Sequence, residues 1–122
     1  RRNYFYYAFS RNFLKAVRFL FDNKACPCIL DLGCGNGWVV RKVENNSLCT
    51  RAVGIDGAKQ MIENARKSGD RSEYLHENID IYNSPDKFDL IHSMEVLYYL
   101  KDPFLTVKKI AFSYANFYFS YN

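Results

Sequence analysis

One short segment, residues 31–37 (DLGCGNG), constrains the fold of this 122-residue chain more than any other. It overlaps the end of an apolar run at residues 28–32, and Gly33, Gly35 and Gly37 recur at every second position. An apolar run stopped by glycines is typical of a buried strand that ends in a tight turn. Glycine allows positive φ there and lets a ligand approach the backbone without a Cβ in between. The segment therefore predicts a strand, a ligand-binding turn and then a helix.

Strand and helix patterns alternate along the rest of the chain. Short apolar runs between turn residues are typical of strands, and apolar residues three or four positions apart are typical of helices. The expected strands cover residues 28–32, 51–56, 73–77, 88–93 and 116–121, and the expected helices cover 38–43, 58–67 and a segment capped by Asp102 with Pro103 at its first position. This alternation predicts an α/β fold, with an open, mostly parallel sheet and helices on both faces. A ligand is then expected beyond the carboxyl ends of the strands.

The N-terminal segment before the glycine turn is rich in aromatic residues. Phe5 and Phe9 begin a series of apolar side chains at helical spacing, which predicts an amphipathic helix over residues 3–22. Residues 1–122 are expected to form a single domain, in which this helix is followed by an α/β core over residues 28–121.

Composition excludes several classes of protein. Charged residues make up 25% and aromatic residues 17% of the chain, which is a globular rather than a disordered composition. No apolar run approaches the ~20 residues that a membrane-spanning helix needs. The formal net charge of +4 comes from scattered Lys and Arg side chains, so a solvated basic surface is expected. A nucleic-acid partner such as RNA is permitted by this charge but is not indicated by it.

The four cysteines favour a reduced, cytoplasmic protein. Cys26 and Cys28 form a Cys-x-Cys pair, but neither a second pair nor a histidine cluster completes a tetrahedral zinc site. Because nothing in the sequence resembles a secretion signal, four free thiols are the expected state. The sequence therefore predicts no bound metal and a cytoplasmic location.

Two acidic residues stand at strand ends, where a ligand is expected. Asp31 comes two positions before Gly33, and a carboxylate there would repel a pyrophosphate but suit a cationic ligand. A dinucleotide-binding turn would have its third glycine at position 38, which is Trp38 here. Asp56 ends the second strand, where a carboxylate can accept both hydroxyls of a ribose. Asp56 can also cap the following helix, and both roles stay open at this point.

Three segments together resemble class I S-adenosylmethionine-dependent methyltransferases. They are residues 29–37 (ILDLGCGNG), 53–56 (VGID) and 88–91 (FDLI). Residues 95–103 (EVLYYLKDP) make the chain most similar to the type 11/type 12 methyltransferase domains, and the resemblance covers about residues 28–121. It implies a Rossmann-like sheet with strand order 3-2-1-4-5. It also implies S-adenosyl-L-methionine as cofactor and S-adenosyl-L-homocysteine as product.

The resemblance further implies which residues hold the cofactor. In the family the glycine turn holds the methionine part, the acidic residue after the second strand holds the ribose hydroxyls, and residues after the third strand hold the adenine. Residues after the fourth strand face the methionine end and the methyl acceptor. The expected cofactor-binding residues are Asp31, Gly33, Cys34, Gly35, Gly37, Asp56, Gly57, Met61, Asn78, Ile79, Ser93 and Met94. Asn78 stands where the family often has an aspartate, and Asp80 is the alternative for that role.

The function implied by the resemblance is transfer of a methyl group by in-line displacement to an unidentified acceptor, expected to be a small molecule. Residues 92–95 (HSME) replace the Asn/Asp-Pro-Pro-aromatic motif of enzymes that methylate base amines, which argues against that class. His92, Glu95 and Tyr98 are candidate catalytic residues, although a histidine at a strand end is more often structural. The alternatives are an RNA- or protein-directed methyltransferase and a non-catalytic S-adenosylmethionine-binding domain.

The chain ends earlier than the family's sheet does. In the family an antiparallel hairpin follows the fifth strand, whereas this chain stops at about that strand and begins with Arg1 rather than Met. We therefore expect a piece of a longer protein, with the C-terminal strands of the family missing. Residues 116–121 would then form an exposed aromatic edge, and a homo-oligomer through that edge is a further expectation.

Overall fold

The structure is a computed structural model that describes residues 5–8, 28–45, 51–68, 72–83, 88–94, 99–106 and 117–120. These residues contain a six-stranded sheet and the two helices α2 and α3. The strands are β1 (Phe5–Ala8), β2 (Cys28–Leu32), β3 (Arg51–Asp56), β4 (Glu73–His76), β5 (Leu90–Met94) and β6 (Phe117–Ser120). The helices are α2 (Trp38–Asn45) and α3 (Lys59–Arg66).

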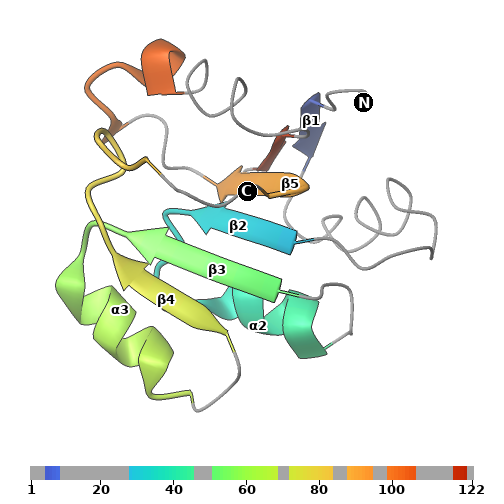
Figure 1. The fold of residues 1–122 in the computed structure, drawn as a ribbon, viewed down its shortest axis with the longest axis vertical. Coiled ribbons are helices and arrows are strands. Elements are labelled where there is room, and N and C mark those ends of the chain that lie inside the picture. Colours follow the sequence, from blue (N-terminus) through green and yellow to red (C-terminus); the bar gives the residue numbers. More distant parts are fainter. Residues whose placement is uncertain are drawn as a thin grey trace.

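The sheet has the strand order β1-β6-β5-β2-β3-β4, and every neighbouring pair is parallel (Figure 1). The five strands from β2 onward therefore follow the expected order 3-2-1-4-5, and this prediction is confirmed. Parallel neighbours must be joined by crossover connections, so the chain returns to the same end of the sheet after each strand. All carboxyl ends consequently meet at one edge, which is where the candidate site residues lie.

The N-terminal strand β1 corrects two expectations. Residues 5–8 form a strand rather than the start of a helix, with Phe5 beside Phe117 in β6. Phe and Tyr favour strands, and pairing with β6 satisfies backbone groups that a helix would have paired internally. Because β1 covers that side of β6, the exposed fifth-strand edge was a wrong expectation, and the homo-oligomer inferred from it loses its basis. The rest of the expected helix, residues 9–22, lies outside the described residues.

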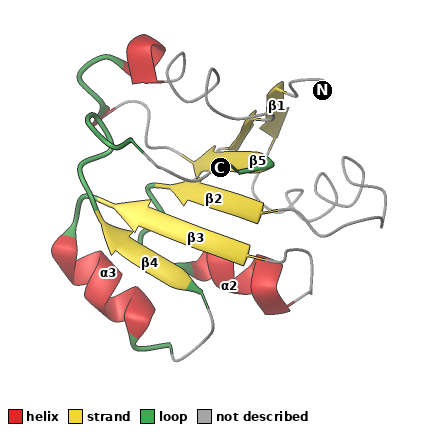
Figure 2. Ribbon diagram, viewed as in Figure 1, coloured by secondary structure: helices red, strands yellow, loops and turns green. Residues whose placement is uncertain are grey.

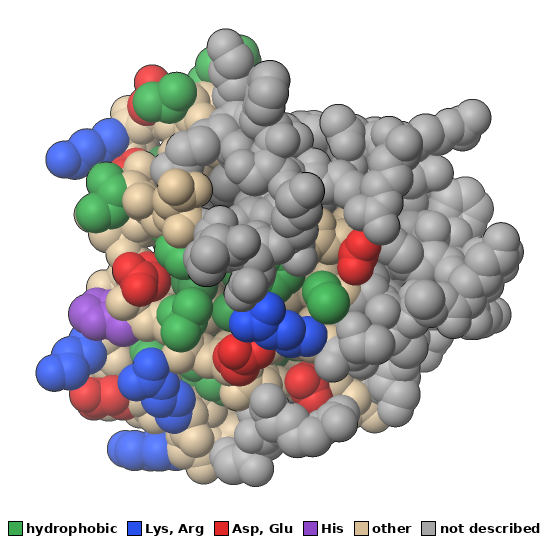
Figure 3. All heavy atoms as spheres, in the orientation of Figure 1, with side chains coloured by type: hydrophobic (Ala, Val, Ile, Leu, Met, Phe, Trp, Pro, Cys, Tyr) green, Lys and Arg blue, Asp and Glu red, His purple; other side chains and the backbone are tan. Residues whose placement is uncertain are grey.

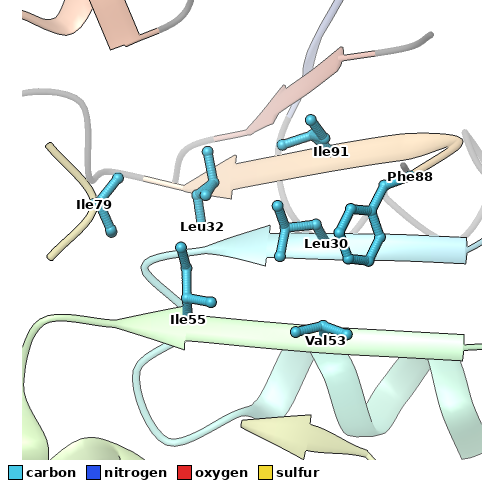
Figure 4. Close-up of a cluster of buried hydrophobic side chains, with 7 residues drawn as sticks. All are labelled: Leu30, Leu32, Val53, Ile55, Ile79, Phe88 and Ile91. Atoms are coloured by element: carbon cyan, nitrogen blue, oxygen red, sulfur yellow. The ribbon is translucent and has the colours of Figure 1, made fainter. Parts of the chain in front are cut away.

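The centre of the sheet is formed by β2 and β3, which are buried along nearly their whole length. Such strands are covered on both faces, which explains their continuous apolar sequence. One face carries a cluster of buried side chains from these strands, from β5 and from two adjoining loops (Figure 4). The cluster consists of Leu30, Leu32, Val53, Ile55, Ile79, Phe88 and Ile91. It ties the loop after β4, through Ile79, to the central strands.

The start of β5 is fixed on β2 by a reciprocal pair of hydrogen bonds. Asp89 N–H donates to the carbonyl of Cys28 at 2.9 Å, and Cys28 N–H donates to Asp89 Oδ2 at 2.9 Å. The neighbouring Phe88 is buried in the core cluster. These contacts set the register of β5 on β2. Three positions farther along both strands, this register places His92 beside Asp31.

Short helices connect the strands and pack against the sheet. Helix α2 contacts β3, and α3 contacts β3 and β4 (Figure 2). Residues 103–106 form a helical turn on the opposite side of the view from α2 and α3. Leu105 N–H donates to Asp102 Oδ1 at 2.9 Å, so the predicted N-cap at Asp102 is confirmed.

The described surface carries charges of both signs. Figure 3 shows Lys and Arg side chains interspersed with Asp and Glu side chains over the described part of this face. A dense basic stripe, which a nucleic-acid partner would require, is therefore not a feature of the described part of this face. Within the described ranges, no helix has the length and apolar character needed to cross a membrane.

Candidate functional site

The glycine turn after β2 is closed by hydrogen bonds to β3 and within itself. The N–H groups of Gly33 and Cys34 both donate to the carbonyl of Ile55, at 2.8 and 2.9 Å. Gly37 N–H donates back to the carbonyl of Cys34 at 3.0 Å. The turn is thus held by backbone hydrogen bonds at the carboxyl edge of the sheet.

One side of this turn is packed so closely against the sheet that an added side-chain atom would clash. A Cβ on Gly37 would lie 2.6 Å from Cε1 of Tyr74, and one on Gly54 would lie 2.8 Å from Sγ of Cys34. Both distances are shorter than real Cβ contacts allow. Gly37 also has a φ of +86°, in the left-handed region. Glycine at both positions is therefore a packing requirement of Tyr74 and Cys34.

Cys34 lies on this packed side and behaves as a core residue. Its side chain is buried, and Sγ contacts the carbonyl oxygen of Gly35 at 3.5 Å. Burial raises the pKa of the Cys34 thiol, and the nearby carboxylates of Asp31 and Asp56 raise it further. The thiol is therefore protonated at neutral pH and is a poor nucleophile.

The other side of the turn is open and faces Asp56. A Cβ on Gly35 would meet nothing within 4 Å, although a φ of +56° disfavours other residues there. Gly35 N–H donates to Asp56 Oδ2 at 2.9 Å, and Ala58 N–H donates to Asp56 Oδ1 at 2.8 Å. The N-cap residue of α3 is Ala58 and makes no side-chain cap bond, so the capping role considered for Asp56 is wrong. Because a carboxylate has about four acceptor sites, Asp56 retains capacity for a ligand.

A cavity of about 720 Å³ lies beside Asp56 at the carboxyl edge of the sheet. Its walls come from the residues that follow β2, β3 and β4 and from the segment after β5. The lining residues are Gly33, Asp56, Gly57, His76, Glu77, Asn78, Ile79, Asp80, Ile81, Tyr99 and Leu100. Among the expected binding residues, this cavity brings together Gly33, Asp56, Gly57, Asn78 and Ile79.

The far wall of the cavity is a loop held by its own side chains. Asn78 Oδ1 accepts a hydrogen bond from Asp80 N–H at 3.0 Å, and Asp80 Oδ1 accepts one from Lys101 N–H at 3.0 Å. The loop after β4 is thereby joined to the segment after β5, so that Ile79 and Leu100 line the same cavity. Asn78 and Asp80 thus both belong to the cavity wall, with Asp80 also anchoring the second segment.

His76 and the neighbouring Glu77 tie this loop to the end of β3. His76 Nε2 donates to the carbonyl of Gly57 at 3.1 Å, since a carbonyl oxygen can only accept. Glu77 N–H donates to the carbonyl of Asp56 at 3.1 Å. The positions of Asp56 and of the cavity wall are therefore coupled through the backbone.

Asp31 and His92 form a buried pair between β2 and β5. His92 Nδ1 donates to Asp31 Oδ1 at 2.7 Å, and the two residues are neighbours in the strand register. Asp31 is 3% exposed and His92 0% exposed, so neither lines the cavity. A general-base role for His92 has no support here, because its imidazole is closed off from solvent.

The remaining expected residues lie outside the cavity wall. Ser93 is buried, and its Oγ donates to the carbonyl of Leu32 at 3.4 Å. Met61 is 44% exposed on α3. Met94 is described for its backbone alone, as the last residue of β5. Glu95 and Tyr98 lie outside the described residues.

Comparison with known proteins decides the family. The family model described as "Methyltransferase domain" matches residues 30–111, which is more than half of the chain. This chain belongs to that methyltransferase family. Its glycine turn, Asp56 and the loop after β4 therefore lie in a methyltransferase domain, as the sequence motifs imply.

Individual methyltransferases resemble the chain over part of their length. The mitochondrial ubiquinone biosynthesis O-methyltransferase of Schizosaccharomyces pombe is 30% identical over 82 residues, which cover 62% of this chain and 29% of the relative. The plantazolicin methyltransferase BamL, solved with a desmethylPZN analog and SAH, is 26% identical with a TM-score of 0.72, covering 84% of this chain and 39% of its own.

A third methyltransferase was solved with a partner protein. It is the putative methyltransferase in complex with the Haloferax volcanii Trm112 methyltransferase activator, 30% identical with a TM-score of 0.66, covering 80% of this chain and 45% of its own. This chain thus spans less than half the length of each of these three methyltransferases.

Sequence reasoning missed several cavity residues of this methyltransferase domain. His76 and Glu77 are the last two residues of the third expected strand, so the rule that ligands bind at strand ends could have found them. Ile81 and Leu100 carried no such signal. Their place in the cavity wall depends on the hydrogen bond between Asp80 and Lys101, which joins residues 21 positions apart in the sequence.

Proposed function

We propose that this chain binds S-adenosyl-L-methionine in the cavity and transfers its methyl group to an acceptor. The observation that carries this proposal is the placement of Asp56. Its carboxylate borders the cavity and is held by the N–H groups of Gly35 and Ala58. A carboxylate fixed in this way can accept hydrogen bonds from the two hydroxyls of a ribose.

The size and lining of the cavity support a nucleoside ligand. Small-molecule sites usually enclose about 300–1,000 Å³, and this cavity measures about 720 Å³. Ile79 and Leu100 offer apolar contact to an adenine ring, while Asn78 and Asp80 offer oxygen acceptors for its amino group. The open space beside Gly35 lets a ligand approach the turn. BamL, whose fold this chain shares, was solved with SAH.

The methionine part of the cofactor is assigned to the glycine turn and the ends of β2 and β5. Asp31 contributes negative charge beneath this region, which favours the sulfonium and ammonium groups of the cofactor. Cys34, Gly37, Ser93 and Met94 belong to this part of the proposal as supporting positions. Met61 stays a prediction for the outer edge of the adenine site.

When bound, S-adenosyl-L-methionine supplies an electrophilic methyl group on a cationic sulfur, and the acceptor displaces S-adenosyl-L-homocysteine as the new bond to methyl forms. The protein's contribution is alignment and exclusion of water, which together can lower a barrier by ~7–11 kcal/mol. The fixed glycine turn and the coupled loops at His76 and Lys101 provide that alignment. Glu95 and Tyr98 stay candidates for contact with the acceptor.

We propose a small molecule as the acceptor and the cytoplasm as the location. The ubiquinone biosynthesis O-methyltransferase supports a small-molecule acceptor by its name, and the large exposed side chains of Ile81 and Tyr99 suit an apolar one. The free thiol of Cys34 is consistent with a reducing compartment.

Calorimetric titration with S-adenosyl-L-homocysteine tests the proposal. We expect micromolar binding by the wild-type chain and at least about a hundredfold weaker binding by Asp56→Ala, which loses charge-assisted hydrogen bonds to two hydroxyls. Glu73→Gln is the matched control, because Glu73 pairs with Arg51 at the amino ends of β4 and β3 and lies away from the cavity. NADH should not bind. Wild-type protein that is folded yet binds no S-adenosyl-L-homocysteine would contradict the proposal.

A further inference from the structure

The buried pair of Asp31 and His92 is unusual among the polar groups of the sheet. Both side chains are almost fully buried, and the 2.7 Å hydrogen bond between them joins two strands whose pairing residues are 61 positions apart. In the described part of the chain, His92 is the hydrogen-bond partner that the structure gives the Asp31 carboxylate. A buried carboxylate is costly unless a partner fixes it, so its orientation is set by the imidazole.

The order of the strands indicates which part of a bound cofactor would lie nearest to Asp31 and His92. In the proposed function the loop after β4 holds the adenine, and Asp56 at the end of β3 holds the ribose. S-adenosylmethionine is a linear molecule in which methionine follows ribose. Continuing in the same direction across the sheet leads from β3 to β2 and then to β5. Asp31 and His92 stand side by side on those two strands.

The methionine part of this cofactor carries its positive charges, on the sulfonium and on the amino group. A carboxylate in a site of low dielectric acts on such charges more strongly than one in water. Asp31 precedes Gly33, a residue of the cavity wall, by two positions. The charge of Asp31 therefore lies under the region that the methionine part would occupy.

We propose that His92 is a positioning residue for the methionine end of the cofactor, and this inference rests on the proposed function. Its imidazole holds one oxygen of the Asp31 carboxylate, which orients the second oxygen and the negative charge toward the cationic groups. His92 does not contact the acceptor. It determines how strongly the site prefers a ligand with the charged amino acid part over the bare nucleoside.

A purely structural role for His92 predicts a different result. If the hydrogen bond only joined β2 to β5, its loss would weaken all ligands alike, because the whole carboxyl edge would loosen. With a positioning role, loss of the imidazole weakens each ligand in proportion to its electrostatic interaction with the buried Asp31 carboxylate. S-adenosyl-L-homocysteine retains the amino acid part, whereas 5′-methylthioadenosine has the same nucleoside without it.

The test is the affinity of both ligands for the full chain and its His92 variants. Relative to 5′-methylthioadenosine, S-adenosyl-L-homocysteine should bind about tenfold more weakly to His92→Ala than to the wild type. His92→Asn places an amide donor near the position of Nδ1 and should restore most of the preference. Leu90→Ala is the control, since Leu90 is a buried residue of β5 that lies toward its amino end.

Equal weakening of both ligands, or no weakening, would overturn the inference while leaving the proposed function standing. Failure of the wild type to bind either ligand would overturn the proposed function, and the inference with it. If His92→Ala does not fold, the imidazole nitrogen resonances of the wild-type chain, which has two histidines, provide the second measurement. The His92 signals should shift with S-adenosyl-L-homocysteine and hardly move with 5′-methylthioadenosine; the same shift with both ligands would overturn the inference.

Discussion

Asp31 and Asp56 stand at the carboxyl ends of adjacent strands, yet the protein surrounds them in opposite ways. Asp31 is buried, and the imidazole of His92 is its partner. Asp56 borders the cavity and is held by two backbone N–H groups. The sequence places both within two positions of a glycine, so local sequence alone does not separate a carboxylate of the interior from one that meets a ligand.

The same division runs through the glycine turn. Gly37 and Cys34 lie on its packed side, against Tyr74 and Gly54, whereas Gly35 opens onto free space. We call these the inner side and the open side. Changes on the inner side should lower the free energy of unfolding, and changes on the open side should mainly lower ligand affinity.

The largest expected effect is at the buried aspartate, Asp31. Asp31→Leu deprives the buried imidazole of its carboxylate partner, and breaking a buried pair in this way costs about 3–5 kcal/mol of stability. Asp56→Asn keeps an acceptor oxygen for one of the two backbone N–H groups and should cost about 1 kcal/mol. Urea unfolding of both variants measures the difference.

The double variant Asp31→Leu with His92→Leu is the control for this prediction. It removes both polar groups together, so most of the lost stability should return. Equal unfolding free energies for Asp31→Leu and the wild type would remove the distinction between the two aspartates.

The two glycines of the turn provide the next comparison. Gly37→Ala adds backbone strain and a clash with Tyr74, for a combined cost of about 2–4 kcal/mol. Gly35→Ala adds strain alone, about 1–2 kcal/mol, but places a methyl group in the open space where the ligand would lie. Thermal unfolding should therefore rank Gly37→Ala as the less stable. Titration with S-adenosyl-L-homocysteine should show a loss of affinity in Gly35→Ala that its small loss of stability does not explain.

The last expected effect on stability appears only at high pH and concerns the thiol of Cys34. Burial raises the pKa of this thiol above its ordinary value of 9.0. Below pH 9 the thiol is protonated in both states and stability is unaffected, whereas above pH 9 it ionises only in the unfolded chain. Stability should then fall with rising pH, by at most about 1.4 kcal/mol per pH unit. Urea unfolding between pH 8 and about pH 10.5 should show this slope in the wild type and a shallower one in Cys34→Ala; identical slopes would contradict it.

The sequence predicted the parts of the fold that short-range pattern determines. The apolar run at residues 28–32, the glycine turn and the cap at Asp102 each depend on a few neighbouring residues, and each is found as predicted. The strand order followed from the family resemblance. The pair of Asp31 and His92 was not predicted, because it requires the register between two strands far apart in the sequence.

The N-terminal segment shows where pattern is ambiguous. Phe5 and Phe9 fit helical spacing, but residues 5–8 also suit a strand. In the structure residues 5–8 pair with β6 and are a strand. A single sequence does not say which partner a strand will find, so the helix expected at residues 5–8 and the expected open edge were both wrong. The cavity wall at Leu100 was missed for the same reason, since Lys101 meets Asp80 only in the folded chain.

The most direct test of the account is whether Asp56 contacts a ribose. The affinities of S-adenosyl-L-homocysteine and of its 2′-deoxyribose analogue should be measured by calorimetry for the wild type and for Asp56→Ala. The account predicts that removing the 2′-hydroxyl weakens binding about tenfold in the wild type and by much less in the variant, which has no carboxylate to receive that hydroxyl. The same loss in both proteins would contradict it, because the hydroxyl would then be recognised by another group.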